Sequence, residues 1–399
     1  MESYIADWLN LLMRWLHMIV GIAWIGASFY FVWLDNHLLP PRNKDDAARR
    51  GVAGEVWAVH GGGFYHAQKF LVGPKGEPLS DHLHWFKWEA YATWFSGMGM
   101  LAIVYWWGAH AYLIDKSVLD ISVPTAIAIS FFSLVTSWFI YDALCKLIKS
   151  ELALGIVLFI FIVAATWGYS QVFGARAAYI HVGSMIGTWM VWNVFFHVIP
   201  GQEKMVTAIR AGRDPDPLPG LIGKQRSVQN TYFTLPVLFV MISSHYPMTY
   251  AHQYGWVVLA VIMLAGALIR QYFVLRHFGR NVVSLPLIAI VLLAGLAVWL
   301  APRSTPVAPG AAAVPYAQIE LILAQRCVAC HAEQPTFPGF QQAPNGLKLD
   351  TPELVKAAAP RIAQQTIATK AMPIGNITKM TDDERSLLGK WLATGASIK

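Results

Sequence analysis

Eight apolar stretches constrain the fold of this chain more than any other feature. They lie near residues 11–34, 89–109, 123–145, 152–170, 178–199, 231–248, 255–275 and 282–301. A helix of about 20 apolar residues crosses the hydrocarbon core of a bilayer and satisfies its own backbone hydrogen bonds there. The sequence therefore predicts an all-α protein in which residues 1–301 form a polytopic bundle of eight transmembrane helices. An even number of spans puts both ends of the chain on one side of the membrane.

The composition agrees with a membrane protein. Only 13% of the 399 residues are charged and 56% are hydrophobic, whereas soluble proteins carry about 25% charged residues. The formal net charge of +7 is spread over the loops, where basic residues set the membrane orientation. We therefore expect membrane lipid as a partner and no nucleic acid.

The basic residues alternate between the connections. The first, third, fifth and seventh connections contain Arg42, Lys44, Arg49, Arg50, Lys69, Lys75, Lys87, Lys146, Lys149, Lys204, Arg210, Arg213, Lys224, Arg226, Arg276 and Arg280. The second and fourth contain only Lys116 and Arg176, and the sixth contains none. Because cytoplasmic loops are enriched in Lys and Arg, we expect a multi-pass protein of the bacterial inner membrane. Its amino terminus and its carboxyl-terminal tail are then on the periplasmic side.

The tail contains the run Cys327-Val-Ala-Cys330-His331. A Cys-x-x-Cys-His run attaches a c-type haem through two thioethers, and its histidine is an axial ligand of the iron. The alternatives are a redox dithiol and half of a zinc site. No thioredoxin-like strand and helix pattern and no second ligand pair accompany the run, so we favour haem c. In bacteria this attachment takes place outside the plasma membrane, which agrees with an external tail.

The sixth ligand of the haem iron is expected to be a methionine thioether, which raises the reduction potential. Two candidates, Met372 and Met380, lie in the stretch KAMPIGNITKMTDDER. We favour Met372, because it lies in an irregular Met-Pro-Ile-Gly loop. Met380 directly precedes a helix start, where Thr381 and Glu384 form a capping-box pattern.

The tail is expected to be a separate domain, residues 317–399, joined by a Pro/Ala-rich linker at 302–316. A first helix is expected from Tyr316 to Gln325. A last helix is expected from Thr381 through Trp391, which should pack on the first. Over its whole length the tail resembles a class I cytochrome c.

Ionisable residues inside the apolar stretches are the candidates for a site in the membrane domain, since placing them in lipid is costly. Those expected at the external end, which we take as catalytic candidates, are Arg14, His17, His181 and His245. Those expected near the cytoplasmic end are Asp142, His197 and Arg270. Each histidine has an alternative role in helix packing, and Arg14 in reaching the membrane surface.

The first long connection, residues 35–88, is unusually rich in histidine and aromatic residues. Loops of this length are uncommon and often functional. We expect this loop either to bind or gate a cytoplasmic substrate, or to lie on the membrane surface through its tryptophans.

Four stretches together carry a family resemblance: the start NLLMRWLHMIVGIAWIGASFYFVWLDNHL, the loop VHGGGFYHAQKF, the run LHWFKWEAYATWFSG and the haem tail. Over essentially its full length the chain resembles the membrane-bound, cytochrome c-linked bacterial urate oxidases. The resemblance implies an eight-span domain and a cytochrome c that oxidise urate to 5-hydroxyisourate in purine breakdown. It also implies that electrons pass to a respiratory-chain acceptor, such as a terminal oxidase or a soluble cytochrome c, without hydrogen peroxide. The residues that carry over are the haem ligands Cys327, Cys330, His331 and Met372.

The chemistry of urate sets requirements on the membrane domain. Urate is a planar anion at neutral pH, so it needs a cationic pocket with stacking aromatics. Arg14 or Arg270 could meet the anion, and a histidine could take a proton. Because urate gives up two electrons and one haem accepts one, the enzyme needs two steps or a second redox centre. A haem b between His17 and either His181 or His245 is our hypothesis for such a centre.

Two other functions stay open at this point. The chain could be a quinol or other small-molecule dehydrogenase that reduces haem c. It could also be a membrane-tethered cytochrome c relay without enzymatic activity. Eight spans with embedded charges are more than an anchor requires, which favours an oxidoreductase.

Overall fold

All eight predicted apolar stretches are helical in the computed structural model, which describes residues 2–301, 314–338 and 340–398. The long helices are α1 (Glu2–Asn36), α3 (Trp88–Met100), α5 (Val123–Leu147), α6 (Glu151–Ser170), α7 (Ala175–Asn193), α9 (Leu218–Ser243), α11 (Gly255–His277) and α12 (Ser284–Trp299). The π-helix η1 (Leu101–Trp107) continues α3, and the π-helix η2 (Val194–Val198) joins α7 to α8 (Ile199–Arg210). Short helices fill three connections: α2 (Lys44–Arg50), α4 (Ala109–Tyr112) and α10 (Pro247–Tyr250).

Five helices in the described part of the chain are long and apolar enough to cross a membrane. They are α1, α5, α6, the continuous segment from Ala175 to Arg210, and α11. Helix α12 is apolar but shorter, with 16 residues. The predicted spans at 89–109 and 231–248 correspond to α3 with η1 and to α9. Crossing by all eight helices therefore stays a prediction.

Local signals explain where two of these helices begin. Ser122 caps α5 by accepting a hydrogen bond from the backbone N–H of Thr125, and Pro124 occupies the first turn. Ser150 caps α6 in the same way through the N–H of Ala153. Such caps satisfy N–H groups that the helix itself leaves free, so the chain turns at these points without burying unpaired donors.

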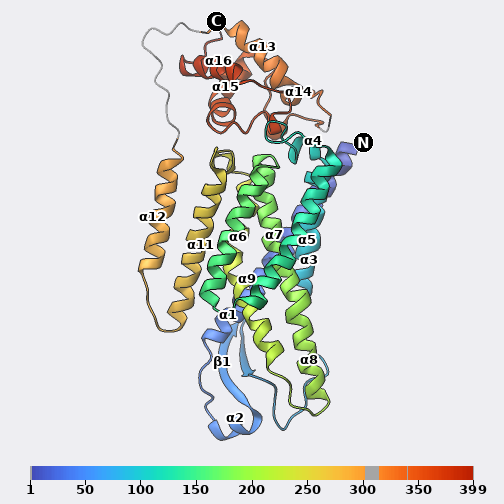
Figure 1. Ribbon diagram of the computed structural model, residues 1–399, viewed down its shortest axis with the longest axis vertical. Helices are drawn as coiled ribbons and strands as arrows, with labels where there is room; N and C mark the ends of the chain where they lie inside the picture. Colours follow the sequence, from blue (N-terminus) through green and yellow to red (C-terminus); the bar gives the residue numbers. More distant parts are fainter. Residues whose placement is uncertain (1, 302–313, 339, 399) are drawn as a thin grey trace.

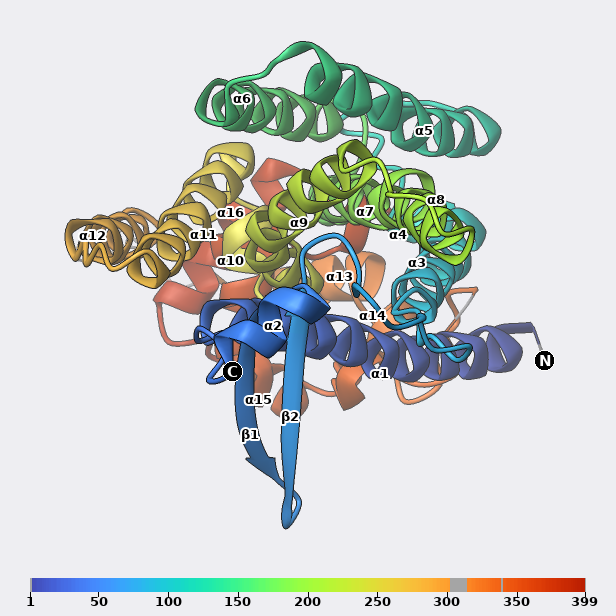
Figure 2. The same cartoon turned by 90° about the horizontal axis from the view of Figure 1, so that it is seen from below.

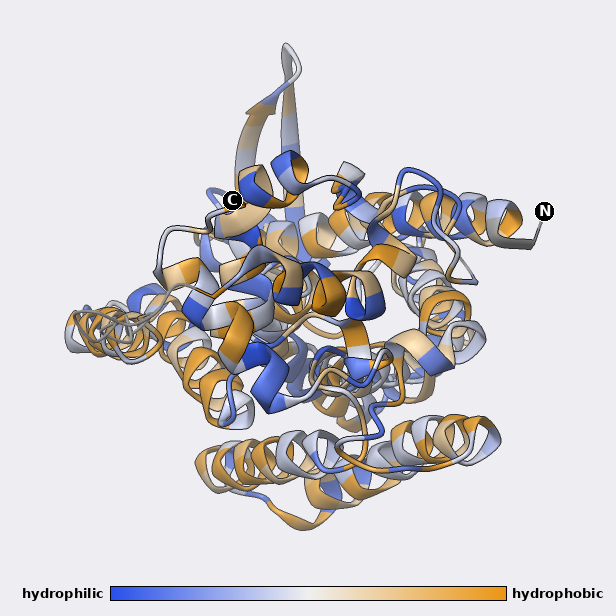
Figure 3. Cartoon of the chain, turned by 90° about the horizontal axis from the view of Figure 1, so that it is seen from above, coloured by the Kyte–Doolittle hydropathy of each residue, from blue (hydrophilic) through white to orange (hydrophobic). Residues whose placement is uncertain are grey.

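Helix α7 lies at the centre of the bundle. The segment from Ala175 to Arg210 is the most buried of the five candidate spans, since 61% of its most apolar 18-residue stretch lies inside the protein. Helices α5 and α6 pack on one side of it, while α1 packs on α3 on the other side (Figure 2). Perimeter helices such as α12 expose mainly apolar residues (Figure 3), as contact with lipid requires.

The two ends of the bundle differ (Figure 1). The start of α1, helices α4 and α10, and the carboxyl-terminal tail lie at one end, called the tail end below. The opposite end, called the hairpin end, carries a β-hairpin. Its two antiparallel strands, β1 (Val52–His60) and β2 (Gly63–Phe70), project beyond the helices (Figures 1 and 2).

The hairpin corrects the all-α expectation for the loop at 35–88. Gly61 and Gly62 connect the strands, and both have positive φ, 60° and 78°. Two consecutive residues with positive φ give the turn type whose twist matches antiparallel strands. Trp57 and His66 face each other across the strands with ring centroids 4.3 Å apart. The aromatic and histidine residues of this loop thus contribute to a folded hairpin.

The tail is a small helical unit over the tail end of the bundle. Its elements are α13 (Tyr316–Arg326), α14 (Val328–His331), the 3-10 helix η3 (Pro344–Gly346), α15 (Pro352–Ile362), the π-helix η4 (Ala363–Ala368), the 3-10 helix η5 (Ile374–Asn376) and α16 (Asp382–Ala393). The predicted first and last helices are confirmed as α13 and α16. Most of the predicted linker, residues 302–313, lies outside the described residues.

The core of the tail confirms two further predictions. Trp391 is 1% exposed and packs beside Tyr316 of α13, with ring centroids 6.0 Å apart. Thr381 and Glu384 form the capping box at the start of α16. Helix α13 thereby packs on α16, and it also contacts α14, where most of the Cys-x-x-Cys-His run lies.

Candidate functional site

The Cys327, Cys330 and His331 side chains lie within one turn at the junction of α13 and α14. The N–H of His331 donates to the Cys327 carbonyl at 2.9 Å, which closes this turn. Burial raises the pKa of the Cys327 thiol to about 12 and also raises that of Cys330. Both thiols are therefore neutral at physiological pH before any modification.

The hydrogen bond of His331 selects the ring tautomer that ligation through Nε2 would need. Its Nδ1 lies 3.0 Å from the carbonyl oxygen of Leu347. A carbonyl only accepts hydrogen bonds, so Nδ1 carries the proton and Nε2 keeps its free electron pair. A histidine that ligates a metal usually donates its other ring N–H in this way. The donor set of the tail thus fits a c-type haem.

The structure separates the two methionine candidates. Met380 is 3% exposed and packs in the apolar core of the tail with Leu388 and Trp391. Met372 lies outside this core in the loop before η5, where its carbonyl accepts a hydrogen bond from Arg385 Nη1 at 2.8 Å. Burial in the core leaves Met380 little freedom to reach a porphyrin, and this geometry favours Met372.

Metal ions are normally held by clusters of His, Cys, Asp and Glu side chains. Among the described residues no three of these side chains gather in such a cluster. A c-type haem does not depend on one, because the porphyrin supplies four ligands and the chain only two.

The three candidate histidines of the membrane domain lie in different surroundings. His17 faces α3, with Nδ1 3.0 Å from both the Thr93 carbonyl oxygen and Ser96 Oγ. His181 is fully buried in α7. His245 is exposed in the connection after α9.

Both ring nitrogens of His181 have partners. Nδ1 donates to the Ala177 carbonyl at 2.7 Å, so Nε2 accepts from Ser130 Oγ, also at 2.7 Å. The ring packs against Phe173 at 4.4 Å between centroids. Iron ligation by His181 would require the Ser130 bond to break. The haem b hypothesis stays an untested prediction.

Two of the three residues predicted near the cytoplasmic end, Asp142 and His197, belong to a polar network. Asp142 accepts from His197 Nε2 at 2.7 Å and from Arg226 Nη2 at 2.6 Å, and it pairs with Lys146 at 2.6 Å. Arg226 is 2% exposed, and its Nε and Nη1 have no partner in the structure. Arg270 is separate from this network and donates to Thr231 Oγ1 at 3.1 Å.

A second group of charged and phenolic side chains lies at the tail end. This group, called the arginine–tyrosine cluster below, consists of Arg14, Tyr105, Tyr112, Arg176 and Tyr250. The two guanidinium groups are close enough to repel each other, and both interact with Tyr105 and Tyr112. Arg176 lies over the ring of Tyr112 at 5.7 Å from its centroid, and its Nε is buried without a partner.

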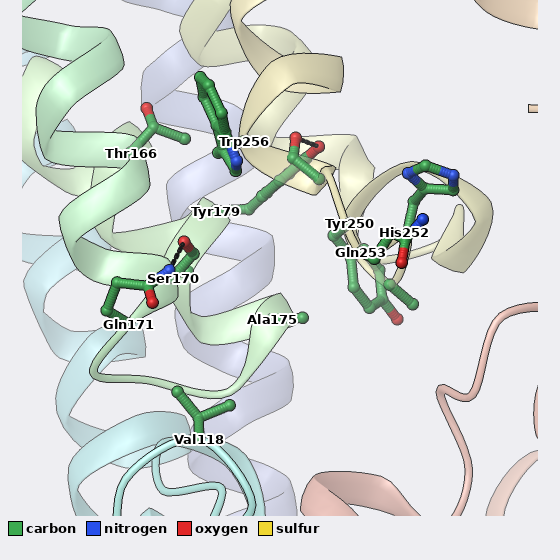
Figure 4. A pocket seen from close by; sticks show the side chains of 13 residues that line it. Val118, Thr166, Ser170, Gln171, Ala175, Tyr179, Tyr250, His252, Gln253 and Trp256 are labelled. Carbon is green, nitrogen blue, oxygen red and sulfur yellow. Dashed lines mark hydrogen bonds between the residues drawn. The ribbon is translucent and has the colours of Figure 1, made fainter. Parts of the chain in front are cut away.

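Tyr250 links this cluster to a cavity of about 230 Å³. The cavity lies where α6, α7, α10 and α11 meet at the tail end, and Figure 4 shows its lining. Tyr179, Trp256 and Thr166 contribute rings and a hydroxyl, and Gln171 and Gln253 contribute amides. Such a mixture of rings and polar groups suits a planar, polar ligand.

The tail lies against this end of the bundle. Gly375 lies close to the backbone just after α4. A Cβ at this position would lie 3.1 Å from the Ile114 carbonyl oxygen. Tyr112 is within electrostatic reach of Cys330, and Asp115 within that of Arg385. The haem-attachment run and the arginine–tyrosine cluster are therefore neighbours.

Sequence reasoning named Arg14 but missed most of its partners. Arg176 appeared only as the single basic residue of its connection, and Tyr105 and Tyr112 were not singled out. An isolated arginine in a connection otherwise free of positive charge was the available signal. Its approach to Arg14 depends on α3, which packs on both α1 and α7.

One family model matches the chain: its description is Urate oxidase N-terminal, and it covers residues 3–301. The match therefore includes every helix of the bundle and the hairpin, and it ends before the tail. Among curated proteins and among solved structures, none matches the chain.

Proposed function

Because the chain belongs to the urate oxidase N-terminal family, we propose that it is a membrane-bound oxidoreductase that converts urate to 5-hydroxyisourate. Electrons leave through a haem c in the tail for a respiratory-chain acceptor, such as a terminal oxidase or a soluble cytochrome c. The observation that carries this proposal is the contact of η5 of the tail with α4, at the end of a bundle that belongs to this family.

The reaction balances without oxygen as the oxidant. Water adds a hydroxyl group to C5 of urate, and two protons and two electrons leave. The haem supplies a one-electron acceptor when it is bound, so two successive transfers to the external acceptor complete one turnover. No hydrogen peroxide is formed, because electrons do not go to dioxygen at this site.

Several residues of the tail are placed to hold a haem and to fix its two axial ligands. Cys327 and Cys330 would hold the porphyrin, and His331 and Met372 would supply the axial ligands. The Leu347 carbonyl keeps Nε2 of His331 free. Arg385 donates to the Met372 carbonyl and so fixes the loop that carries the thioether.

The membrane arrangement forms part of the proposal. We place the tail end on the periplasmic side, with all eight long helices crossing the inner membrane. The basic odd-numbered connections support this orientation. The position of the start of α1 and the tail at one end of the bundle also supports it (Figure 1).

The test is anaerobic addition of urate to the purified full-length protein. We expect the absorbance of urate to fall while the spectrum of reduced c-type haem appears. When ferric cytochrome c is added as the external acceptor, two of its haems should be reduced for each urate consumed. Reduction by a quinol but not by urate would favour the quinol dehydrogenase alternative. If neither urate nor a quinol reduces the haem, the electron-relay alternative is favoured.

A further inference from the structure

We propose that the substrate anion binds between Arg14 and Arg176, with Tyr105 and Tyr112 beside it, at the tail end of the bundle. This inference rests on the proposed function and adds the position of the substrate. It places the site at the end of the bundle that the tail contacts through η5 and α4, and the tail is where the electron acceptor would be attached.

Charge is the first argument for this site. Among the described residues no carboxylate forms an ion pair with Arg14 or Arg176. Asp7 is the nearby carboxylate, and it acts on Tyr112. Arg14 is exposed on the outside of the bundle, whereas the Nε of Arg176 is buried. Two like charges repel each other, and the repulsion is strongest where water is excluded, as it is at Arg176. An anionic substrate would relieve this repulsion.

Unused hydrogen-bond donors are the second argument. The Nε–H of Arg176 is buried and has no acceptor in the structure. Leaving a buried charged donor unpaired destabilises the protein, because the group loses its water without gaining an acceptor. Arg14 uses its own Nε for Asn10 Oδ1 at 2.7 Å, which fixes the direction of its guanidinium. A ligand with carbonyl oxygens, such as a urate anion, supplies the missing acceptor.

Shape is the third argument. The Tyr112 ring lies beneath the guanidinium of Arg176, and Tyr105 is only 5% exposed. Flat rings beside cationic groups suit a planar purine, since they offer contact area together with hydroxyl groups. Through Tyr250 the cluster adjoins the cavity of Figure 4, which provides room at the tail end.

The rival position is the Arg226 network at the hairpin end. Arg226 is also buried and also has unpartnered nitrogens. It differs because Asp142 neutralises it at 2.6 Å, so a second anion would meet a carboxylate as well. It lies in the first half of α9, which begins at the end of the bundle away from the tail (Figure 1). Charge and position therefore favour the arginine–tyrosine cluster.

The experiment measures urate binding and turnover in the full-length holoprotein with Arg176→Gln, Arg14→Gln and Arg176→Lys. Arg280→Gln, which changes an exposed arginine at the hairpin end, is the matched control. We expect the dissociation constant of radiolabelled urate, measured by equilibrium dialysis, to rise about 10- to 100-fold in each Gln variant. Arg176→Lys should recover part of the loss, and Arg280→Gln should bind like the wild type.

Two outcomes would overturn this inference, and a third would overturn only the proposed function. If both Gln variants fold, retain their haem and bind urate with the wild-type constant, the substrate binds elsewhere while the proposed function stands. If the variants change the haem spectrum or reduction potential but not urate binding, the arginines serve the haem instead. If the wild type binds urate through these arginines but never oxidises it, the proposed function fails and the site survives.

Discussion

Gly375 of the tail lies against the carbonyl oxygen of Ile114 at the carboxyl end of α4. A Cβ at position 375 would lie 3.1 Å from that oxygen and 3.4 Å from the carbonyl oxygen of Ala111. Backbone atoms cannot move aside as a flexible side chain can. The absence of a side chain at Gly375 therefore allows the tail to approach the arginine–tyrosine cluster.

The first prediction concerns this contact. Gly375→Ala should push the tail away from α4 and slow reduction of the haem by urate about tenfold or more, since electron transfer depends steeply on separation. The haem spectrum should not change. Single-turnover kinetics in a stopped-flow instrument measure the effect.

A matched control separates docking from backbone strain. Gly346 of the tail also has positive φ, 65°, but a Cβ there meets no atom within 4 Å. Gly346→Ala should therefore carry a similar conformational cost without slowing haem reduction. Equal slowing in both variants would show that strain, and not contact with Ile114, is responsible.

The second prediction distinguishes the methionines. Met372→Leu should remove the sixth ligand, so the methionine–iron charge-transfer band disappears and the reduction potential falls. Met380→Leu is a volume-conserving change in the core and should cost less than about 1.5 kcal/mol with the band intact. Optical titration of the two variants checks this, and the reverse pattern would reassign the ligand to Met380.

The third prediction concerns Arg385, which is 8% exposed and donates to the carbonyls of Thr366 and Met372 at 2.6 and 2.8 Å. Arg385→Lys keeps the charge but loses the geometry of two simultaneous bonds. We expect about 1.5–3 kcal/mol lower stability of the tail and a broadened methionine–iron band. Arg361→Lys changes an exposed arginine on α15 and should leave both properties unchanged.

The fourth prediction is a pH dependence of the tail. Arg326 donates to both carboxylate oxygens of Glu384, at 2.9 to 3.1 Å. Burial opposes ionisation of Glu384, but the hydrogen bonds from Arg326 and the Thr381 backbone outweigh it and lower the pKa of this carboxyl below 4.5. Its contribution to stability is therefore complete above pH 4.5 and is lost as the pH falls through the lower folded-state value.

Thermal melts of the holoprotein, followed by the haem absorbance at a series of pH values, measure this effect. Glu384→Gln should be about 1 kcal/mol less stable than the wild type at pH 7. Below the folded-state pKa the two proteins should converge. A constant difference at all pH values would show that the carboxylate charge does not contribute.

The fifth prediction concerns the network at the hairpin end. Arg226→Gln should destabilise the bundle by about 3–5 kcal/mol, because Asp142 would lose a buried partner. The double variant with Asp142→Asn should recover most of that loss. The urate dissociation constant should stay at the wild-type value in every variant that folds. A specific rise in this constant would move the substrate to the Arg226 network.

Much of the fold was determined by the sequence alone, because its signals are local. Hydropathy placed each long helix, and caps such as Ser122 and Thr381 fixed helix starts within a few residues. The Cys327–His331 run also carries its chemistry in five consecutive residues. The Gly61-Gly62 pair between residues of high strand propensity was a usable hairpin signal, and its neglect produced the all-α expectation.

Tertiary structure decided what depends on packing between helices. Hydropathy does not tell which faces of α3 meet α1 and α7, so the approach of Arg14 and Arg176 was not predictable from either segment. Ser130, the partner of His181 Nε2, likewise comes from α5, and the burial of Met380 comes from the folded core of the tail. Local composition sets which segments become helices, whereas side-chain packing between distant segments sets which charges share one site.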